Sequence, residues 1–489
     1  MPIVLVILVG TVLLARGDAG GAVEARACAW TLVAGTLGPL VALAAIVRSA
    51  RAGLGSGSAT VASRAVARAE RMRRLVPWIA TAAVATATHA FGWLGAIRGA
   101  IGDVPALDEL VAILPAVATM VAATWIHWPL EQRLRRLAWL DRIESGLPPW
   151  PEPGRTRATL AWVRGGGITI VLVPVVAILA ASETAEGLVA PVAGPDAAAL
   201  ASLVASVATL LVSPLLLRYA LGLGPLPPGP VRDEVSLACA AHRVRLAGAY
   251  VWPTGGLVAN AAILGILPRL RYLLLSDLLL AALSREEILA VVEHELAHVK
   301  RRHLPWMALA VASIAVLAAV AADESLRAVG GGADAAVRLE LAGGVLSGVA
   351  AFLGLGWISR RFERQADAFA AAELSRRAGS PVVEFAAVEA TASALDRVAE
   401  LAHVDPRRPS WRHGSIRWRQ GNLKAIAGLP VDRLPIDRTV RRIKFATLVA
   451  SAVAAWLLVR MPAGSPADHS VHPKYDAVAF DEGTAACAS

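Results

Sequence analysis

The sequence has little cysteine. Only three cysteines occur in 489 residues, namely Cys28, Cys239 and Cys487. Their separations match neither a zinc-knuckle spacing nor a disulfide framework, so cysteine chemistry is not expected to be central.

Aromatic residues are also scarce, at 5% of the chain, and no recognised nucleic-acid motif is present. The net charge of +10 comes from Arg residues that lie between apolar segments. Basic surfaces for nucleic acid usually carry interleaved aromatic residues, which are missing. We therefore expect no nucleic-acid partner, and interpret the Arg residues as determinants of membrane topology.

Charged residues make up only 18% of the chain, whereas 56% of residues are hydrophobic and the mean hydropathy is +0.57. This is too apolar for soluble domains of such length, so the sequence predicts a mainly α, polytopic helical membrane protein. About nine apolar segments are long enough, or nearly so, to cross a hydrocarbon core of roughly 30 Å as helices. They are residues 2–15, 28–47, 75–97, 105–127, 168–181, 197–217, 304–322, 339–358 and 445–459. We expect the first to be an uncleaved helix, the alternative being a signal-peptide core.

The positions of the Arg residues predict the orientation, because loops rich in Lys and Arg stay cytoplasmic. Residues 48–74 and 133–164 are Arg-rich loops, whereas residues 182–196 are acidic. Alternation along the chain then places residues 218–303 and 359–444 inside and the acidic tail, residues 461–489, outside. The protein is thus expected in the cell membrane, with two long polar segments on the cytoplasmic side.

The first polar segment opens with a Pro-rich stretch, residues 224–230, that ends the membrane helices. Short strands are predicted at residues 243–251, 257–263 and 272–276, which would form a small β-sheet. A helix is predicted from about residue 285 to 303. Its start is indicated by Ser284 with Glu287 three residues on, the capping-box arrangement.

This helix carries His294, Glu295 and His298. Positions i and i+4 lie one above the other on a helix, so the two imidazoles can bind one zinc ion. Glu295 would project beside them, towards a water whose pKa zinc lowers. The alternative interpretation is a pair of surface histidines on an ordinary helix. The pattern predicts a catalytic Zn²⁺ site.

A catalytic zinc usually takes three protein ligands, so one more is needed. The best candidate is Glu363, which lies just after a predicted membrane helix and on the same predicted side. Asp367 lies four residues later on the same helical face and is suited to accept a proton from a ligand histidine. The alternative is an exposed i,i+4 charge pattern with Arg360 and Arg364 as partners.

At these residues the sequence resembles the integral-membrane zinc metallopeptidases that include the CAAX prenyl proteases and the HtpX-like proteases. The resemblance covers about residues 231–423. It rests on the histidine helix with its continuation to His303, on residues 359–367, and on Asn260-Ala261-Ala262 followed by residues 273–280. It implies a gluzincin-type zinc protease domain with Glu363 as third ligand.

The resemblance also implies further site residues. In such proteases an edge strand pairs with the substrate backbone, which makes Asn260 and Ala261 candidate substrate contacts. His413, followed by Arg419, resembles a late His-Pro segment with its Arg, although Gly414 stands where the family usually has Pro. The implied roles are oxyanion stabilisation for His413 and substrate binding for Arg419. Structural roles for Asn260 and a solvent-facing His413 remain alternatives.

Five regions are predicted. They are an N-terminal membrane domain (1–224), the first half of the catalytic domain (225–303), two membrane helices (304–358), the second half of the catalytic domain (359–444), and a last membrane helix with an extracytoplasmic tail (445–489). We expect a membrane-embedded zinc metalloendopeptidase with Glu295 as general base, active in membrane-protein quality control or peptide processing. Its expected partners are a peptide or membrane-protein substrate and the lipid bilayer; the oligomeric state is not predicted.

Two other functions are compatible with these patterns. One is a membrane sensor-transducer built on a protease domain, although the short outer tail leaves little room for a sensing domain. The other is a non-catalytic membrane scaffold that retains the zinc site. Glu295 argues against a scaffold, because structural zinc sites fill all four positions with protein ligands.

Overall fold

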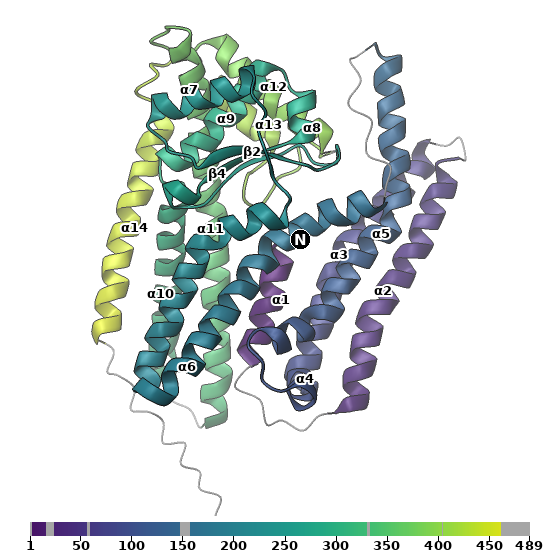
Figure 1. Cartoon of the computed structure of the whole chain (residues 1–489), viewed down its shortest axis with the longest axis vertical. Helices are drawn as coiled ribbons and strands as arrows, with labels where there is room; N and C mark the ends of the chain where they lie inside the picture. Colours follow the sequence, from purple (N-terminus) through teal and green to yellow (C-terminus); the bar gives the residue numbers. More distant parts are fainter. Residues whose placement is uncertain are drawn as a thin grey trace, which may run out of the picture. The chain divides into compact units, whose positions relative to one another are not determined.

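The computed structural model describes residues 2–15, 24–55, 59–146, 157–329, 333–402 and 404–460. The acidic tail and Cys487 lie outside the described residues. Helices dominate (Figure 1). The N-terminal ones are α1 (Pro2–Leu14), α2 (Ala25–Gly53), α3 (Ala59–Phe91), α4 (Trp93–Ile101), α5 (Leu107–Glu144) and α6 (Arg157–Ala220).

The later helices carry or flank the polar segments. They are α7 (Pro230–His242), α8 (Asp277–Ala282), α9 (Arg285–Lys300), α10 (His303–Val329), α11 (Ala333–Arg377), α12 (Phe385–Leu401), α13 (Ile416–Lys424) and α14 (Pro435–Arg460). A short 3₁₀ helix, η2, spans Pro268–Leu270.

All nine predicted apolar segments fall on helices, but they do not make nine separate long helices. Two of them share α6, whose backbone is non-helical at Gly194 (φ 81°). A third is split between α3 and α4, which meet at a 76° bend beside Gly92 (φ 68°). Among the described residues, six helices are therefore long and apolar enough to span a bilayer, or seven if the bent pair counts as one span; α1 is shorter.

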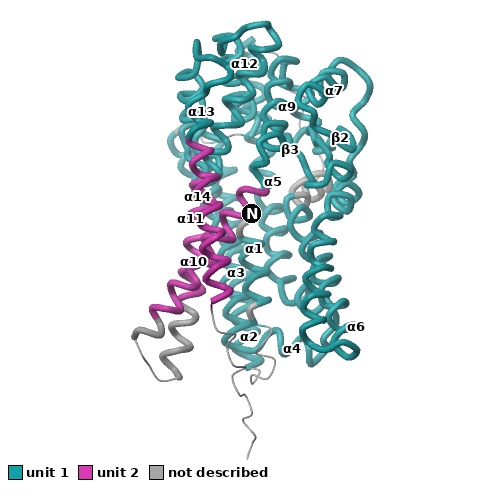
Figure 2. Tube along the Cα trace, turned by 90° about the vertical axis from the view of Figure 1, so that its left-hand side faces the viewer, with its two compact units in different colours: residues 1–304, 359–438 teal, residues 305–358, 439–489 magenta. Residues whose placement is uncertain are grey.

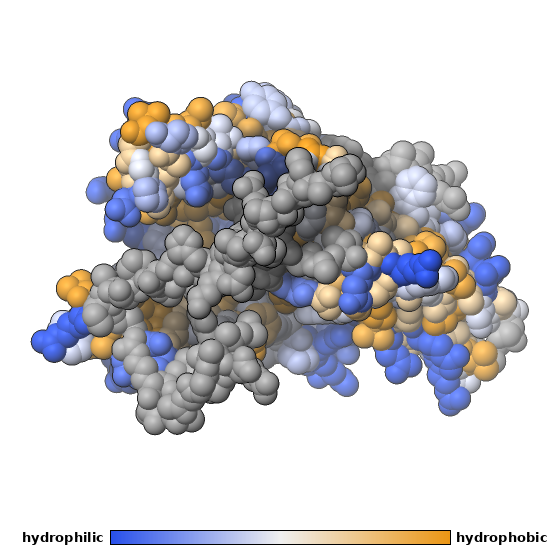
Figure 3. Space-filling view, turned by 90° about the horizontal axis from the view of Figure 1, so that it is seen from below, coloured by the Kyte–Doolittle hydropathy of each residue, from blue (hydrophilic) through white to orange (hydrophobic). Residues whose placement is uncertain are grey.

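Large apolar side chains lie on the surface of these helices, as the orange patches in Figure 3 illustrate. On α2, Trp30 is 73% exposed and Val41 67% exposed. Such a surface is costly in water but matches hydrocarbon chains. The chain is a multi-pass membrane protein.

A small mixed sheet lies in the polar part of the chain. Its strands are β1 (Gly224–Pro225), β2 (Gly248–Trp252), β3 (Ala261–Leu264) and β4 (Tyr272–Ser276), in the order β1-β2-β4-β3. β2 and β4 are parallel and the other pairs antiparallel. β3 is therefore an edge strand, with its outer backbone groups turned away from the sheet.

The predicted strands were partly wrong at their boundaries. Residues 272–276 form β4 as expected, but β3 begins only at Ala261 and β2 only at Gly248. The predicted start of β2 was too early because α7 runs to His242. Arg243 then adopts a left-handed conformation (φ 54°) at the C-terminus of α7. The predicted helix 285–303 also ends earlier, at Lys300.

The contact pattern divides the chain into two compact units (Figure 2). One comprises Met1–Leu304 with Ser359–Arg438, and the other Pro305–Ile358 with Thr439–Ser489. In the first unit, a core of buried side chains joins β4 to α9, with Leu273, Leu275 and Leu296 fully buried. This core holds one face of α9 against the sheet and leaves its opposite face for polar side chains.

Candidate active site

The N-terminus of α9 is fixed by the predicted capping box. The Ser284 hydroxyl accepts the backbone N–H of Glu287 at 3.2 Å, and the Glu287 carboxylate accepts the N–H of Ser284 at 2.8 Å. Leu296 and Ala297 turn into the core and are fully buried. The start and the rotation of α9 are thereby set, which directs His294 and His298 to one side.

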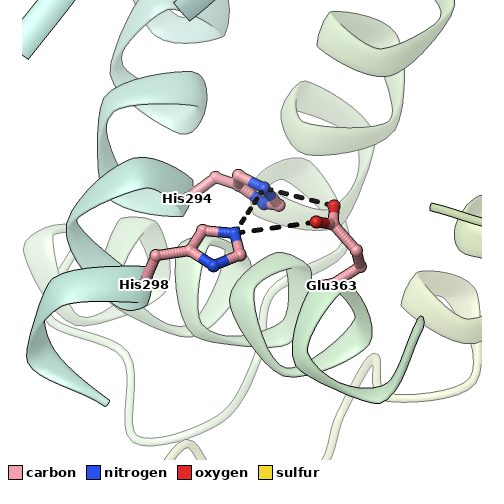
Figure 4. A group of neighbouring side chains, drawn as sticks. All are labelled: His294, His298 and Glu363. Carbon is pink, nitrogen blue, oxygen red and sulfur yellow. Dashed lines mark hydrogen bonds and ion pairs between the residues drawn. The ribbon is translucent and has the colours of Figure 1, made fainter. Parts of the chain in front are cut away.

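His294, His298 and Glu363 converge in the structure (Figure 4). The two histidines project from α9 and the glutamate from α11, and their ligand atoms all lie within 4.8 Å of one another. The His294 and His298 Nε2 atoms are 3.3 Å apart. The Glu363 carboxylate oxygens lie 3.7 Å from His294 Nε2 and 3.9 Å from His298 Nε2.

These positions fit a tetrahedral zinc ion. Two ligands at about 2.0–2.1 Å from zinc and a tetrahedral angle are roughly 3.4 Å apart, which matches the two Nε2 atoms. The two Glu363 separations need only a small inward movement. Among the residues that the structure describes, two imidazoles and one carboxylate form this group, which leaves a fourth position without a protein ligand, as in catalytic rather than structural zinc sites.

His294 is oriented from behind by a buried ion pair. Its Nδ1 lies 3.0 Å from an Asp367 carboxylate oxygen. Arg419 donates two hydrogen bonds to Asp367, at 2.8 and 2.6 Å, and its guanidinium is 3.5 Å from Glu363. Asp367 therefore accepts the Nδ1 proton and leaves the Nε2 lone pair of His294 facing the cluster.

Glu295 lies beside the cluster, at the edge strand. The backbone amide of Ile263 in β3 lies near its carboxylate. Burial raises the pKa of Glu295 to about 7, and the negative charge of Glu363 adds to this effect, whereas the Ile263 amide acts to lower the pKa. A carboxyl group whose pKa is close to neutral can both accept and return a proton at physiological pH.

The edge strand presents alternate residues to the open side. Asn260 pairs with Ser276 of β4, because its carbonyl accepts the Ser276 N–H at 3.0 Å and its N–H donates to the Ser276 hydroxyl at 2.9 Å. In an antiparallel ladder the next residue turns its backbone groups the other way. Ala261 and Ile263 therefore face outward from the sheet, whereas the Asn260 backbone is already used.

His413 and Arg419 both reach the cluster from the segment around α13. His413 Nδ1 is 3.0 Å from Glu363, and its side chain is 48% exposed. Arg419 is only 7% exposed and binds acidic side chains of the protein itself. The structure thus gathers His294, Glu295, His298, Glu363, Asp367, His413 and Arg419 in one place, with Asn260 and Ala261 on the neighbouring strand.

Three nearby residues were not singled out by sequence reasoning. The backbone amide of Ile263 lies near Glu295 and acts on its pKa, an effect that no side chain reveals. His303 lies 3.0 Å from His298, and Gln365 lies 2.9 Å from His303. The only available signal was a further histidine five residues after His298.

Residues 249–464 match the sequence model described as Peptidase family M48. This region, somewhat less than half of the chain, is similar to that peptidase family. The matched region contains every residue of the cluster, from the edge strand to Arg419.

Among curated proteins, none matches the chain significantly. Among solved structures, the chain is similar to the crystal structure of S. mikatae Ste24p. The identity is 15% and the TM-score 0.46, over 81% of this chain and 98% of that chain. The match to a peptidase family and the apolar helices together support a membrane metallopeptidase.

Proposed function

We propose that this protein is a zinc-dependent endopeptidase of the M48 kind, whose ion is held by His294, His298 and Glu363. The observation that carries the proposal is the convergence of these three donors, with a fourth position open, next to the half-buried carboxylate of Glu295. Zinc, when bound, supplies a Lewis acid that lowers the pKa of water and polarises a peptide carbonyl.

The protein residues divide the remaining tasks. Glu295 accepts the proton of the attacking water and delivers it to the leaving amine, for which its raised pKa is suited. Asp367 and Arg419 orient His294 and support Glu363. His413, half exposed beside Glu363, is positioned to donate a hydrogen bond to the oxyanion that forms on the substrate.

The edge strand β3 provides a binding site for an extended peptide. A substrate that adds to this edge would pair with the outward backbone groups of Ala261, one residue after Asn260. The Ile263 backbone amide on the same edge lies near Glu295, so a peptide bound there would lie beside the general base. Main-chain pairing favours unfolded or extended segments of many sequences over one specific motif. Arg419, by contrast, we assign to the ion pair that orients His294.

Cleavage of an unstructured reporter peptide by the purified full-length protein tests the proposal. We expect activity that a chelator abolishes and Zn²⁺ restores. The variant Glu295→Gln should retain wild-type zinc content and lose about 10²–10⁴-fold in kcat, the usual contribution of a general base.

The matched control is Glu286→Gln, the same substitution at an exposed site in the first turn of α9. It should cleave at the wild-type rate. Unchanged cleavage by Glu295→Gln would refute the assigned base, and activity that is insensitive to the chelator would refute the zinc mechanism.

A further inference from the structure

His303 is buried behind His298 by an unusual turn of the chain. α9 ends at Lys300, and Arg302 then adopts a left-handed conformation (φ 55°), which is unfavourable for a residue with a side chain. His303 begins α10 directly after this turn and is only 2% exposed. Its ring stacks on Phe362 at a centroid distance of 4.4 Å and an angle of 8°.

A chain of hydrogen bonds runs outward from His298 through His303. His303 Nδ1 lies 3.0 Å from His298 Nδ1, and His303 Nε2 lies 2.9 Å from the Gln365 side-chain oxygen. The Gln365 side-chain nitrogen in turn donates to a carboxylate oxygen of Asp437. Each link joins one nitrogen or amide group to the next, so the direction of one bond determines the others.

The carboxylate at the outer end sets that direction. An ionised Asp437 can only accept, so the Gln365 nitrogen donates and its oxygen must accept from His303 Nε2. A neutral imidazole has one N–H, which leaves His303 Nδ1 as an acceptor. The partner atom, His298 Nδ1, must then carry the proton, and its Nε2 keeps the lone pair.

We propose that His303 is a positioning residue that fixes the tautomer and ring orientation of His298 for metal binding. The inference rests on the proposed zinc site. The lone pair it sets is on His298 Nε2, the atom that lies 3.3 Å from His294 Nε2 and faces Glu363. The two ligand histidines are thus oriented differently, His294 by a charged carboxylate and His298 by a neutral imidazole.

The distinction has a physical consequence for the site. A carboxylate behind a ligand histidine adds negative charge, whereas a neutral imidazole orients the ring without adding charge. Since the cluster already contains Glu363, Asp367 and Glu295, a neutral partner for His298 avoids a further anion. The buried stack on Phe362 fixes the plane in which the His303 acceptor points.

Two variants of His303 distinguish the role of its hydrogen-bond acceptor from the role of its ring. His303→Phe keeps an aromatic ring against Phe362 and removes the acceptor. His303→Asn places a side-chain oxygen close to the position of Nδ1 and removes the ring. The measurement is the zinc dissociation constant of the full-length protein, obtained by competition with a chromophoric chelator and independent of cleavage.

We expect His303→Phe to bind zinc about 10–100-fold more weakly than the wild type, the usual effect of losing a partner behind a ligand. His303→Asn should recover most of that loss. Equal affinity of His303→Phe and the wild type, or equal weakness of both variants, would overturn the acceptor role. If instead the wild type itself bound no zinc, the proposed metal site would fail, which is a different result.

Gln365→Leu provides a second test if His303→Phe does not yield a monodisperse protein. It leaves His303 in place but removes the acceptor of its Nε2 proton, so His303 is no longer restricted to one tautomer. Zinc affinity should fall, by less than in His303→Phe. An unchanged affinity in Gln365→Leu would contradict the proposed direction of the hydrogen-bond chain.

Discussion

Asp367 and Arg419 form a strongly paired group next to the proposed metal ligands. Both are buried, at 2% and 7% exposure, and two hydrogen bonds join them. Burial alone would lower the pKa of Arg419, but the nearby carboxylates, Asp367 foremost, raise it overall. Removal of one partner leaves the other charge buried without compensation, which is far more costly than loss of an exposed ion pair.

Asp367→Asn should therefore weaken zinc binding by about 10–100-fold. It should also destabilise the protein by about 3–5 kcal/mol, because Arg419 loses its main counter-charge. The two effects can be separated by the double variant Asp367→Asn/Arg419→Met, which removes both charges. We expect the double variant to regain thermal stability but not zinc affinity, as measured by unfolding in detergent and by chelator competition. Recovery of both together would show that Asp367 has no direct part in metal binding.

The proposed role of His413 in stabilising the oxyanion can be tested by kinetics. Its Nδ1 contacts Glu363, yet nearly half of its side chain remains exposed. A group that stabilises the oxyanion contributes to kcat and little to substrate affinity. His413→Ala should thus lower kcat by about 10²–10³-fold with KM and zinc affinity nearly unchanged. A loss of zinc affinity of comparable size would instead assign His413 to the support of Glu363.

The residues of this site differ in how predictable they were. His294, Glu295 and His298 follow from helical spacing, and Glu363 from the need for a third ligand on the same side of the membrane. His303 could not be predicted, because its contact with His298 depends on the left-handed turn at Arg302 and on Gln365, far along the chain. Spacing on one helix is visible in a sequence, whereas a partner across a turn is not.

Among the elements, α5 contacts the loop that leads into the edge strand. Its Trp128 is 1% exposed and packs on Leu257 and Val258. About two helical turns further on, Arg135 donates to the Leu257 carbonyl at 3.3 Å. The same loop also contacts Asp277, the first residue of α8 directly after β4. The Asp277 carboxylate accepts a hydrogen bond from the Thr254 hydroxyl. The N-terminal helices thus support the strand proposed to bind substrate.

Trp128→Ala should loosen that loop and weaken substrate binding. The truncation of a buried Trp typically costs about 3–5 kcal/mol. We expect a raised KM and faster hydrogen exchange at residues 254–260, with zinc affinity retained. Trp125→Ala is the matched control, because Trp125 lies on the same helix but is 47% exposed. Equal effects of the two substitutions would rule out a specific role for the contact with Leu257.

Element boundaries were predictable where local chemistry sets them. The capping box located the start of α9, and nine apolar runs located the membrane helices. The strand predicted over residues 243–251 was wrong for Arg243, Val244, Arg245 and Leu246, which precede β2. Val244 and Leu246 do pack against the core while the arginines face outward, but no neighbouring strand pairs with them. Alternating burial shows only that one side of a segment faces the core. Such a segment is a strand only when another strand pairs with it.

At the scale of the whole molecule, the proposed site joins two segments that membrane helices separate in the sequence. His294 and His298 precede α10, and Glu363 follows the apolar part of α11. Both segments must then lie on one side of the bilayer. Reporter fusions after His303 and before Ser359 should both report a cytoplasmic position. Opposite positions of the two reporters would be incompatible with a shared metal ion.

The same arrangement has a consequence for the synthesis and membrane insertion of the protein. A growing chain exposes the histidine helix first, and Glu363 emerges only after α10 and most of α11 have been made, several seconds later at roughly 5–20 residues per second. Until both helices have inserted, the proposed ion lacks its third ligand. A protease whose site is completed last cannot digest the unfolded chains that surround it during its own insertion.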